Sequence, residues 1–186
     1  MDKKPIIVNL FGGPGSGKST TSAGVFHKLK LNGVNCELVT EFAKHLTWKK
    51  DYNSLGNQVF VFGKQHDRMF HLKDKVDVII TDSPLIMGLA YCDYSRVSPS
   101  FEKFVVDEFT REDSENVNIF LNRVKKYVPI GRSQTEDEAK EKDLSIKDLL
   151  YSHNIPFMIF DGDSSASDII SEYIMEKLKE KVVSDK

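Results

Sequence analysis

The sequence predicts an α/β protein built on a parallel β-sheet, and two observations carry this prediction. Runs that are almost wholly apolar, including 6–11, 76–81 and 117–121, alternate with longer stretches in which apolar residues recur every three or four positions. Strands buried on both faces of a parallel sheet have continuous apolar runs, and the longer stretches have the period of amphipathic helices. A glycine-rich loop also follows the first run directly and opens a helical pattern. We therefore expect 6–11 to be the central strand.

The other elements follow in order along the chain. Asn32 and Gly33 form a suitable end for the first helix, and Pro84 prevents simple continuation of the third strand. The helical periodicity predicts helices over 18–32, 54–75, 85–91, 100–111 and 166–181, and the apolar runs predict further strands over 35–40, 76–81, 117–121 and 155–160.

The composition is typical of one globular domain, residues 1–186. The chain is 40% hydrophobic and 29% charged, and its 26 basic and 28 acidic residues give a net charge of −2. This balance weighs against a strongly basic nucleic-acid surface. No apolar run is long enough for a secretory signal or a membrane span, so no membrane partner is expected. Cys36 and Cys92 lie far apart in the sequence, which favours free thiols in a reducing, cytoplasmic compartment.

The glycine-rich loop fits G-x-x-x-x-G-K-[ST] at every fixed position. Glycines let the chain turn tightly round a phosphate, so that backbone N–H groups and the next helix N-terminus point at its oxygens. In such a loop Lys18 reaches the β- and γ-phosphates and Ser19 holds Mg²⁺. The alternative is a glycine-rich turn with an accidental Lys-Ser, but the preceding strand and following helix favour nucleotide binding. The expected nucleotide-binding residues here are Gly12, Gly13, Pro14, Gly15, Ser16, Gly17, Lys18, Ser19 and Thr20.

Acidic residues follow two of the predicted strands. Ligands of open α/β sheets bind at the carboxyl ends of the strands, so Glu41, after 35–40, is a candidate site residue. Its alternative role is to complement a helix dipole in a first turn. Asp82 follows 76–81 and can hold Mg²⁺ through a water molecule or accept a proton from the acceptor. Its alternative role is to cap the helix at 85–91.

Four further residues are candidates for the acceptor side of the site. Trp48 and Tyr52 could stack on a planar acceptor or pack in the core. Arg68 and Arg96 would bind the acceptor if it carries a phosphate. Because the chain has only five arginines, a hydroxyl acceptor is favoured.

A basic segment that begins at Arg123 and ends at Arg132 predicts a lid, residues 123–140. Cations that close over a triphosphate neutralise charge on the transferring group and expel water. The alternative is a solvated basic loop. A capping box over 133–136 is expected to start the next helix. The polar first half of that helix, with the pairs Glu136/Lys140 and Glu138/Lys142, suits a mobile arm.

With these residues the chain resembles the P-loop kinase superfamily of nucleoside and nucleotide monophosphate kinases. Within it, the chain is similar to the NadR-type ribosylnicotinamide kinase domain and to related ATP-binding proteins common in phages. The resemblance covers most of the chain, and its carriers are the phosphate loop at 12–19, Glu41-Phe42-Ala43-Lys44, Gln65, Thr81-Asp82, Gly131-Arg132-Ser133 and Asn154-Ile155-Pro156-Phe157.

The resemblance implies a three-layer fold: a five-stranded parallel sheet in the order 2-3-1-4-5, helices on both faces, and a lid after strand 4. It implies that adenine lies near Asp161, Gly162 and Asp163, and that Asp82 acts near Mg²⁺ or as a base. Glu41 would contact the acceptor, with Phe42 and Gln65 on the same side. Thymidylate and deoxynucleoside kinases usually have an arginine directly after the strand 3 acid, where this chain has Ser83-Pro84.

The function expected from the sequence is that of an ATP- and Mg²⁺-dependent small-molecule kinase. ATP would lie in the phosphate loop, and a nucleoside- or nucleotide-like acceptor would lie between Glu41 and Asp82. Lys18, Arg123 and Arg132 would contact the transferred phosphoryl group. Two alternatives remain: a kinase with a nucleic-acid acceptor, and a non-kinase ATPase or nucleotide switch that acts on a protein partner. A cytoplasmic location is expected, in the host cytoplasm if the chain is phage-encoded. The sequence leaves the oligomeric state open between a monomer and a homodimer.

Overall fold

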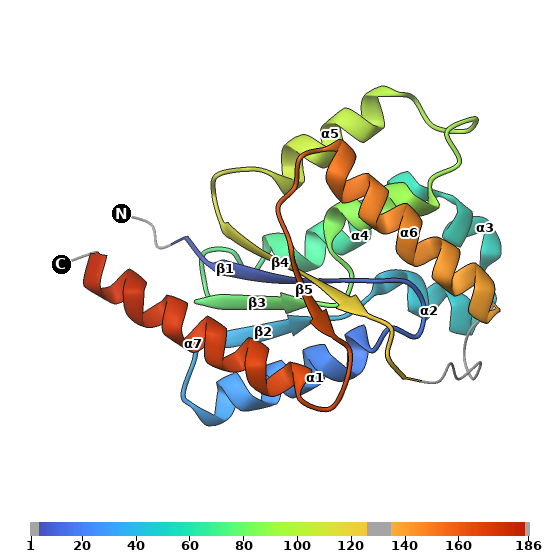
Figure 1. Ribbon diagram of the computed structural model, residues 1–186. Helices are drawn as coiled ribbons and strands as arrows, with labels where there is room; N and C mark the ends of the chain where they lie inside the picture. Colours follow the sequence, from blue (N-terminus) through green and yellow to red (C-terminus); the bar gives the residue numbers. More distant parts are fainter. Residues whose placement is uncertain (1–3, 126–134, 185–186) are drawn as a thin grey trace.

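The computed structural model describes residues 4–125 and 135–184, with the side chains of the last three left out (Figure 1). A single sheet of five parallel strands has the order β2-β3-β1-β4-β5, which confirms the order predicted from the resemblance. The strands are β1 (Ile6–Phe11), β2 (Cys36–Val39), β3 (Val78–Thr81), β4 (Glu115–Asn122) and β5 (Met158–Asp161).

Strand β1 is the central strand, as the sequence predicts. It pairs with β3 on one side and β4 on the other, so that Val8 lies opposite both Ile80 and Val117. All six of its residues are buried. A strand covered on both faces needs an apolar side chain at nearly every position, which explains the continuous apolar run.

Two helices cover one face of the sheet. Figure 1 shows α1 (Lys18–Leu31) and α7 (Ala166–Ser184) side by side on this face. Alternate residues of a strand point to the same face, so the β1 residues here are Ile6, Val8 and Leu10. They share one core cluster with Val25, Leu29, Ile170 and Ile174.

The opposite face carries α4 (Gln58–Phe70), α5 (Ser100–Phe109) and α6 (Glu136–Ser152), which Figure 1 shows on the other side of the strands. The short 3₁₀ helix η1 (Leu85–Tyr91) packs among them. The second core cluster includes Ile7 and Phe11 of β1 together with Met69, Val105 and Ile146. The fold thus has the three layers that were predicted.

The single helix predicted over 54–75 is wrong. Over this range the chain instead forms the end of α3 (Tyr52–Gly56) and then α4, with turns after α4, and a separate helix α2 (Phe42–Lys49) precedes the range. The break falls at Asn57, whose side-chain oxygen accepts a hydrogen bond from the backbone N–H of Phe60 at 3.2 Å. Asparagine competes for backbone donors in this way, so it favours a helix start over a helix interior.

The capping box predicted over 133–136 is also wrong in position. Ser133 lies outside the described residues, and Thr135 caps α6 together with Glu138. Ser133 and Thr135 are each followed by a glutamate three residues later, so both fit the S/T-x-x-E/Q pattern. The pattern alone therefore did not determine which of them begins the helix. The Glu136–Lys140 pair forms at 3.2 Å, but Lys142 donates to the Ala90 carbonyl instead of pairing with Glu138.

Two smaller sequence predictions concern the cysteines and membrane association. Cys36 and Cys92 are both free, as expected. Across residues 4–125 and 135–184, no helix combines the length and apolarity that crossing a bilayer requires.

We expect Ile170→Ala to lower the free energy of unfolding by about 2–5 kcal/mol, because it leaves a cavity in a buried position. Ile170 is 0% exposed, whereas Ile169 on the same helix is 44% exposed. Ile169→Ala is therefore the matched control and should change this free energy by less than about 0.5 kcal/mol. Urea denaturation followed by circular dichroism measures both. Equal losses would contradict the packing of α7 against the sheet.

Candidate active site

The phosphate loop joins β1 to α1 and has a backbone that requires glycine. Gly12, Gly15 and Gly17 have φ values of 137°, 83° and 104°, a region that other residues rarely adopt. The Lys18 ammonium donates hydrogen bonds to the carbonyl oxygens of Gly12 at 2.6 Å and Gly13 at 3.0 Å. Lys18 therefore curls back over the loop.

The loop presents features that fit a phosphate group. Ser16 is 2% exposed, and among residues 4–125 and 135–184 its hydroxyl has no hydrogen-bond partner. A buried hydroxyl is normally paired, so this donor fits an oxygen of a bound anion. The N-terminus of α1 adds the positive end of a helix dipole.

Asp82 joins three parts of the site. One carboxylate oxygen accepts a hydrogen bond from the Ser19 hydroxyl at 2.6 Å, and the other accepts one from the backbone N–H of Glu41 at 3.0 Å. Asp82 is 3% exposed. The helix-cap alternative for Asp82 is wrong, because Pro84 precedes η1 and no side chain caps it.

The oxygen donors of Ser19 and Asp82 suit Mg²⁺. Magnesium prefers oxygen ligands and usually keeps several waters while it binds one or two carboxylates and the phosphates of a substrate. In the described part of the chain, no group of three His, Cys, Asp or Glu residues forms a complete metal site. A metal held jointly by the protein and a nucleotide is compatible with that finding.

Burial is the largest influence on the pKa values of Glu41 and Lys18. It raises the pKa of the Glu41 carboxyl; Lys18 opposes this shift, and Asp82 adds to it. Burial also lowers the pKa of Lys18, against the attraction of Glu41, Asp82 and Asp143. A carboxylate with a raised pKa is a stronger base than an ordinary one, so Glu41 is suited to accept a proton.

The expected acceptor-side residues Phe42, Gln65 and Arg68 hold the start of α2 beside the strand ends. The Gln65 carbonyl oxygen accepts from the backbone N–H of Phe42 at 3.0 Å. Arg68 donates to the carbonyl oxygen of Thr40 at 3.1 Å, and its guanidinium lies 5.2 Å from the centre of the Phe42 ring. These contacts fix the backbone on both sides of Glu41.

The remaining acceptor-side candidates lie on the surface. Trp48 and Tyr52 are 67% and 62% exposed, so their packing in the core is wrong. Arg96 is also exposed, and it lies near Gly56 at the end of α3. Tyr91 of η1 lies closer to the acids: burial, Glu41 and Asp143 together raise the pKa of its phenol.

The loop after β5 packs directly on the phosphate loop. A Cβ atom on Gly162 would lie 2.2 Å from the carbonyl oxygen of Ser16, so this position tolerates only glycine. Asp161 ends β5 beside it. Asp163 accepts hydrogen bonds from the backbone N–H groups of Ser165 and Ala166, and so caps α7. Of the three residues predicted near adenine, Gly162 lies against the phosphate loop, whereas the Asp163 carboxylate bonds the start of α7.

The structure describes only part of the predicted lid, and Arg132 lies outside the described residues. Arg123 donates to the carboxylate of Asp143 at 3.0 Å, and the same carboxylate accepts from the backbone N–H of Gly13. The first half of α6 is not held by its own ion pairs alone, since Ala139 is fully buried. Sequence reasoning missed Asp143, although an acid within an apolar helical stripe was a signal.

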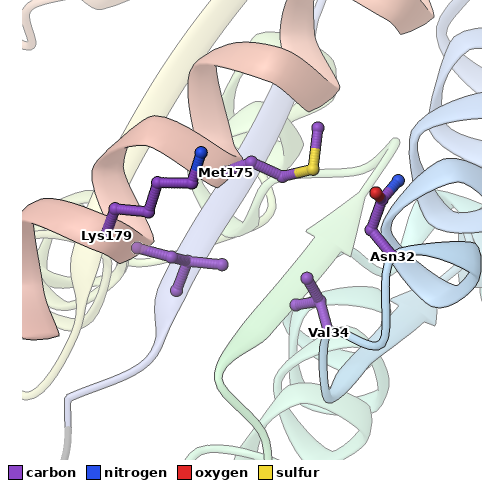
Figure 2. Close-up of a pocket in the computed structure, with 5 residues that line it drawn as sticks. Asn32, Val34, Met175 and Lys179 are labelled. Atoms are coloured by element: carbon purple, nitrogen blue, oxygen red, sulfur yellow. The ribbon is translucent and has the colours of Figure 1, made fainter.

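A separate groove lies away from these residues. Figure 2 shows Asn32 and Val34, at the end of α1 and before β2, facing Met175 and Lys179 of α7. Its volume is about 490 Å³, and Leu178 completes its lining. Residues that precede a parallel strand lie at the opposite edge of the sheet from those that follow it, so this groove is remote from the phosphate loop.

The sheet order and the phosphate loop after its central strand define the class: a P-loop protein with a nucleotide-kinase fold. Residues 7–166 match the family model described as AAA domain, which is most of the chain, and the protein therefore belongs to this family. A comparison with the curated proteins found no match.

Two solved structures show the same fold. The thymidylate kinase of Ehrlichia chaffeensis is 14% identical with a TM-score of 0.59, and the alignment covers 92% of this chain and 99% of that chain. The deoxyadenosine kinase of M. mycoides, determined with bound dATP, is 20% identical with a TM-score of 0.55, and the alignment covers 93% and 99%. At these identities the likeness establishes the fold and not the substrate.

We expect Glu41→Gln to raise the melting temperature at pH 7–8 by a few degrees, and to raise it much less near pH 4. A carboxyl with a raised pKa in the folded state destabilises the fold once it ionises, so the wild type loses stability as pH rises above the unfolded value. A change of about 1 kcal/mol shifts the melting temperature by about 2–4 °C in a domain of this size. Thermal scans from pH 4 to 8 measure the difference. The exposed Glu112→Gln is the control, and a Glu41→Gln benefit independent of pH would contradict the burial of this charge.

Proposed function

We propose that the protein is an ATP- and Mg²⁺-dependent kinase that transfers the γ-phosphoryl group to a nucleoside- or nucleotide-like small molecule. The observation that carries the proposal is the double contact of Asp82, to the Ser19 hydroxyl and to the backbone of Glu41. It joins the end of the phosphate loop to the backbone of a second acidic residue, which follows the neighbouring strand β2. Phosphoryl transfer needs this proximity, because it depends mainly on positioning and on charge stabilisation.

The nucleotide would be held on the β1–α1 side. The backbone of 12–19 and Thr20 would bind the phosphates, with Lys18 at the β- and γ-phosphates, while Ser19 and Asp82 hold Mg²⁺. Bound ATP with Mg²⁺ would supply the phosphoryl group and neutralise part of its charge. The close packing of Gly162 on Ser16 supports an adenine position near 161–163.

The acceptor would lie over the strand ends between Glu41 and Asp82. Glu41 is the better base of the two, because burial raises its pKa while Asp82 is bonded to Ser19. Phe42 and Gln65 would act on the acceptor side of the site by holding the start of α2 in place. The exposed ring of Trp48 offers a surface on which a planar base can stack. Ribosylnicotinamide is one compound of this class.

A hydroxyl acceptor is favoured over a phosphate acceptor. Arg68, the expected phosphate contact, is bonded to the Thr40 carbonyl and stacked on Phe42. Arg96 lies on the surface near α3. A phosphate on the acceptor would therefore have to share Arg68 with the contacts that hold the backbone beside Glu41.

Coupled ADP release tests the proposal. Purified protein is assayed with ATP and Mg²⁺ against nucleosides, deoxynucleosides, their monophosphates and ribosylnicotinamide, at low and moderate salt. One acceptor that raises the rate about 100-fold or more over background supports the kinase. A flat panel overturns it: acceleration by oligonucleotides with steep salt dependence would indicate a nucleic-acid acceptor, and slow hydrolysis alone would indicate an ATPase or nucleotide switch.

We expect Lys18→Ala to lower the transfer rate by about 100- to 1000-fold, because it removes a preorganised charge from the transferring phosphates. The fold should be retained, because within the described residues the hydrogen bonds of Lys18 run to the carbonyls of its own loop. Lys64→Ala, an exposed lysine on α4, is the control and should keep near-normal activity. Near-normal transfer by Lys18→Ala would remove the phosphate-loop mechanism.

A further inference from the structure

Asp143 is a charged residue within the buried stripe of α6. Ala139, Ile146 and Leu150 of this stripe are fully buried, and Asp143 lies four residues after the first and three before the second. Residues at this spacing share one face of a helix. The Asp143 side chain is accordingly only 14% exposed. Burying a carboxylate costs free energy unless it is paired, so its partners explain its presence.

The two oxygens of Asp143 have different partners. One accepts a hydrogen bond from the backbone N–H of Gly13 in the phosphate loop. The other lies 3.0 Å from both Nε and Nη2 of Arg123, whose side chain is 8% exposed. A second Arg123 contact, to the carbonyl oxygen of Ala139 at 3.4 Å, ties the guanidinium to the same helix. Asp143 thus connects the phosphate loop to the first cation after β4.

The backbone of α6 approaches the phosphate loop as closely as the side chain does. A Cβ atom on Gly13 would lie 2.6 Å from the Ala139 carbonyl oxygen and 2.8 Å from the Asp143 carboxylate. Gly13 is not among the glycines with positive φ, so close packing and not backbone conformation explains the glycine here. The helix is therefore seated on the loop at two points.

Neither nucleotide affinity nor packing accounts for an acid at this position. A negative charge beside a phosphate loop repels a triphosphate, and Asp143 is near enough to Lys18 to act on its pKa. An apolar residue would complete the stripe of α6 without the cost of burying an ion pair. What the carboxylate adds is a fixed orientation for the planar guanidinium of Arg123.

We propose that Asp143 is a positioning residue that holds Arg123 and the first turn of the phosphate loop in one arrangement for phosphoryl transfer. A guanidinium has five N–H donors, so Arg123 can bond Asp143 and a phosphate oxygen together. Held in place, it meets the charge of the transferring group without reorganisation. This inference rests on the function proposed above.

The test separates catalysis from binding in Asp143→Asn. The amide oxygen can still accept from the backbone N–H of Gly13, so the loop should keep its contact with α6, whereas the melting temperature should fall because the buried guanidinium of Arg123 loses its charged partner. We expect kcat to fall on the order of 10- to 100-fold, because the guanidinium loses its charged partner and its orientation. The KM for ATP and the affinity for a fluorescent ATP analogue should stay the same or improve, because a negative charge beside the phosphates is removed. Asp148→Asn, an exposed acid on the same helix, should leave all three values unchanged.

A double-mutant cycle identifies the residue through which Asp143 acts. We expect Arg123→Gln with Asp143→Asn to have nearly the same kcat as Arg123→Gln alone, because a positioning residue has no effect once its target is gone. Additive losses in kcat overturn the inference. A kcat for Asp143→Asn within twofold of the wild type also overturns it, as does a loss of kcat accompanied by weaker binding of the fluorescent ATP analogue.

Failure of the kinase proposal is recognised separately. If no acceptor in the panel accelerates ADP release, the proposed function fails, and the same variants are compared by background ADP release from ATP and Mg²⁺ and by titration of the fluorescent analogue. A slower background reaction with undiminished affinity in Asp143→Asn would still support positioning of Arg123. Unchanged background rates would overturn it.

Discussion

The tight turn of the backbone between β1 and α1 is the constraint on which the rest of the site depends. Three glycines with positive φ form it, and two neighbours approach it so closely that a Cβ atom would collide: the loop after β5 at Gly162 and helix α6 at Gly13. The loop is therefore held from both sides by elements far away in the sequence. A loop supported in this way offers its N–H groups to a phosphate without first having to be ordered.

Asp82 extends this arrangement across the sheet. Parallel strands end at one edge, so β2 and β3 deliver Glu41 and Asp82 next to the start of α1. Gln65 and Arg68 of α4 fix the backbone around Glu41 through Phe42 and Thr40. Burial raises the pKa of the Glu41 carboxyl and lowers the pKa of Lys18, so that it disfavours the charged form of both groups. The position of the acids thus determines their chemistry.

The charges around the loop oppose one another, and in the proposed kinase this balance would favour transfer over tight binding. Lys18 and Arg123 face Glu41, Asp82 and Asp143. Asp82 suits a metal ion, which leaves Asp143 as the acid that opposes the phosphates while it orients Arg123. Interactions that strengthen only as charge develops in the transition state raise kcat, whereas uniform attraction lowers KM alone. The AAA-domain family and the nucleotide-kinase fold provide the scaffold, and these side chains decide the chemistry.

The sequence by itself determined the features that depend on near neighbours. The apolar runs predicted the strands, the spacing of Gly12, Gly17 and Lys18 predicted the phosphate loop, and the acid after β3 predicted Asp82 as a site residue. The sheet order followed from the resemblance that these motifs carry. Only the tertiary structure decided the commitment of Arg68 to Thr40 and the bond of Asp143 to the phosphate loop, 130 residues away along the chain. The reason is physical: local patterns fix periodicity and turns, while the partner of a buried charge is set by which distant elements pack together.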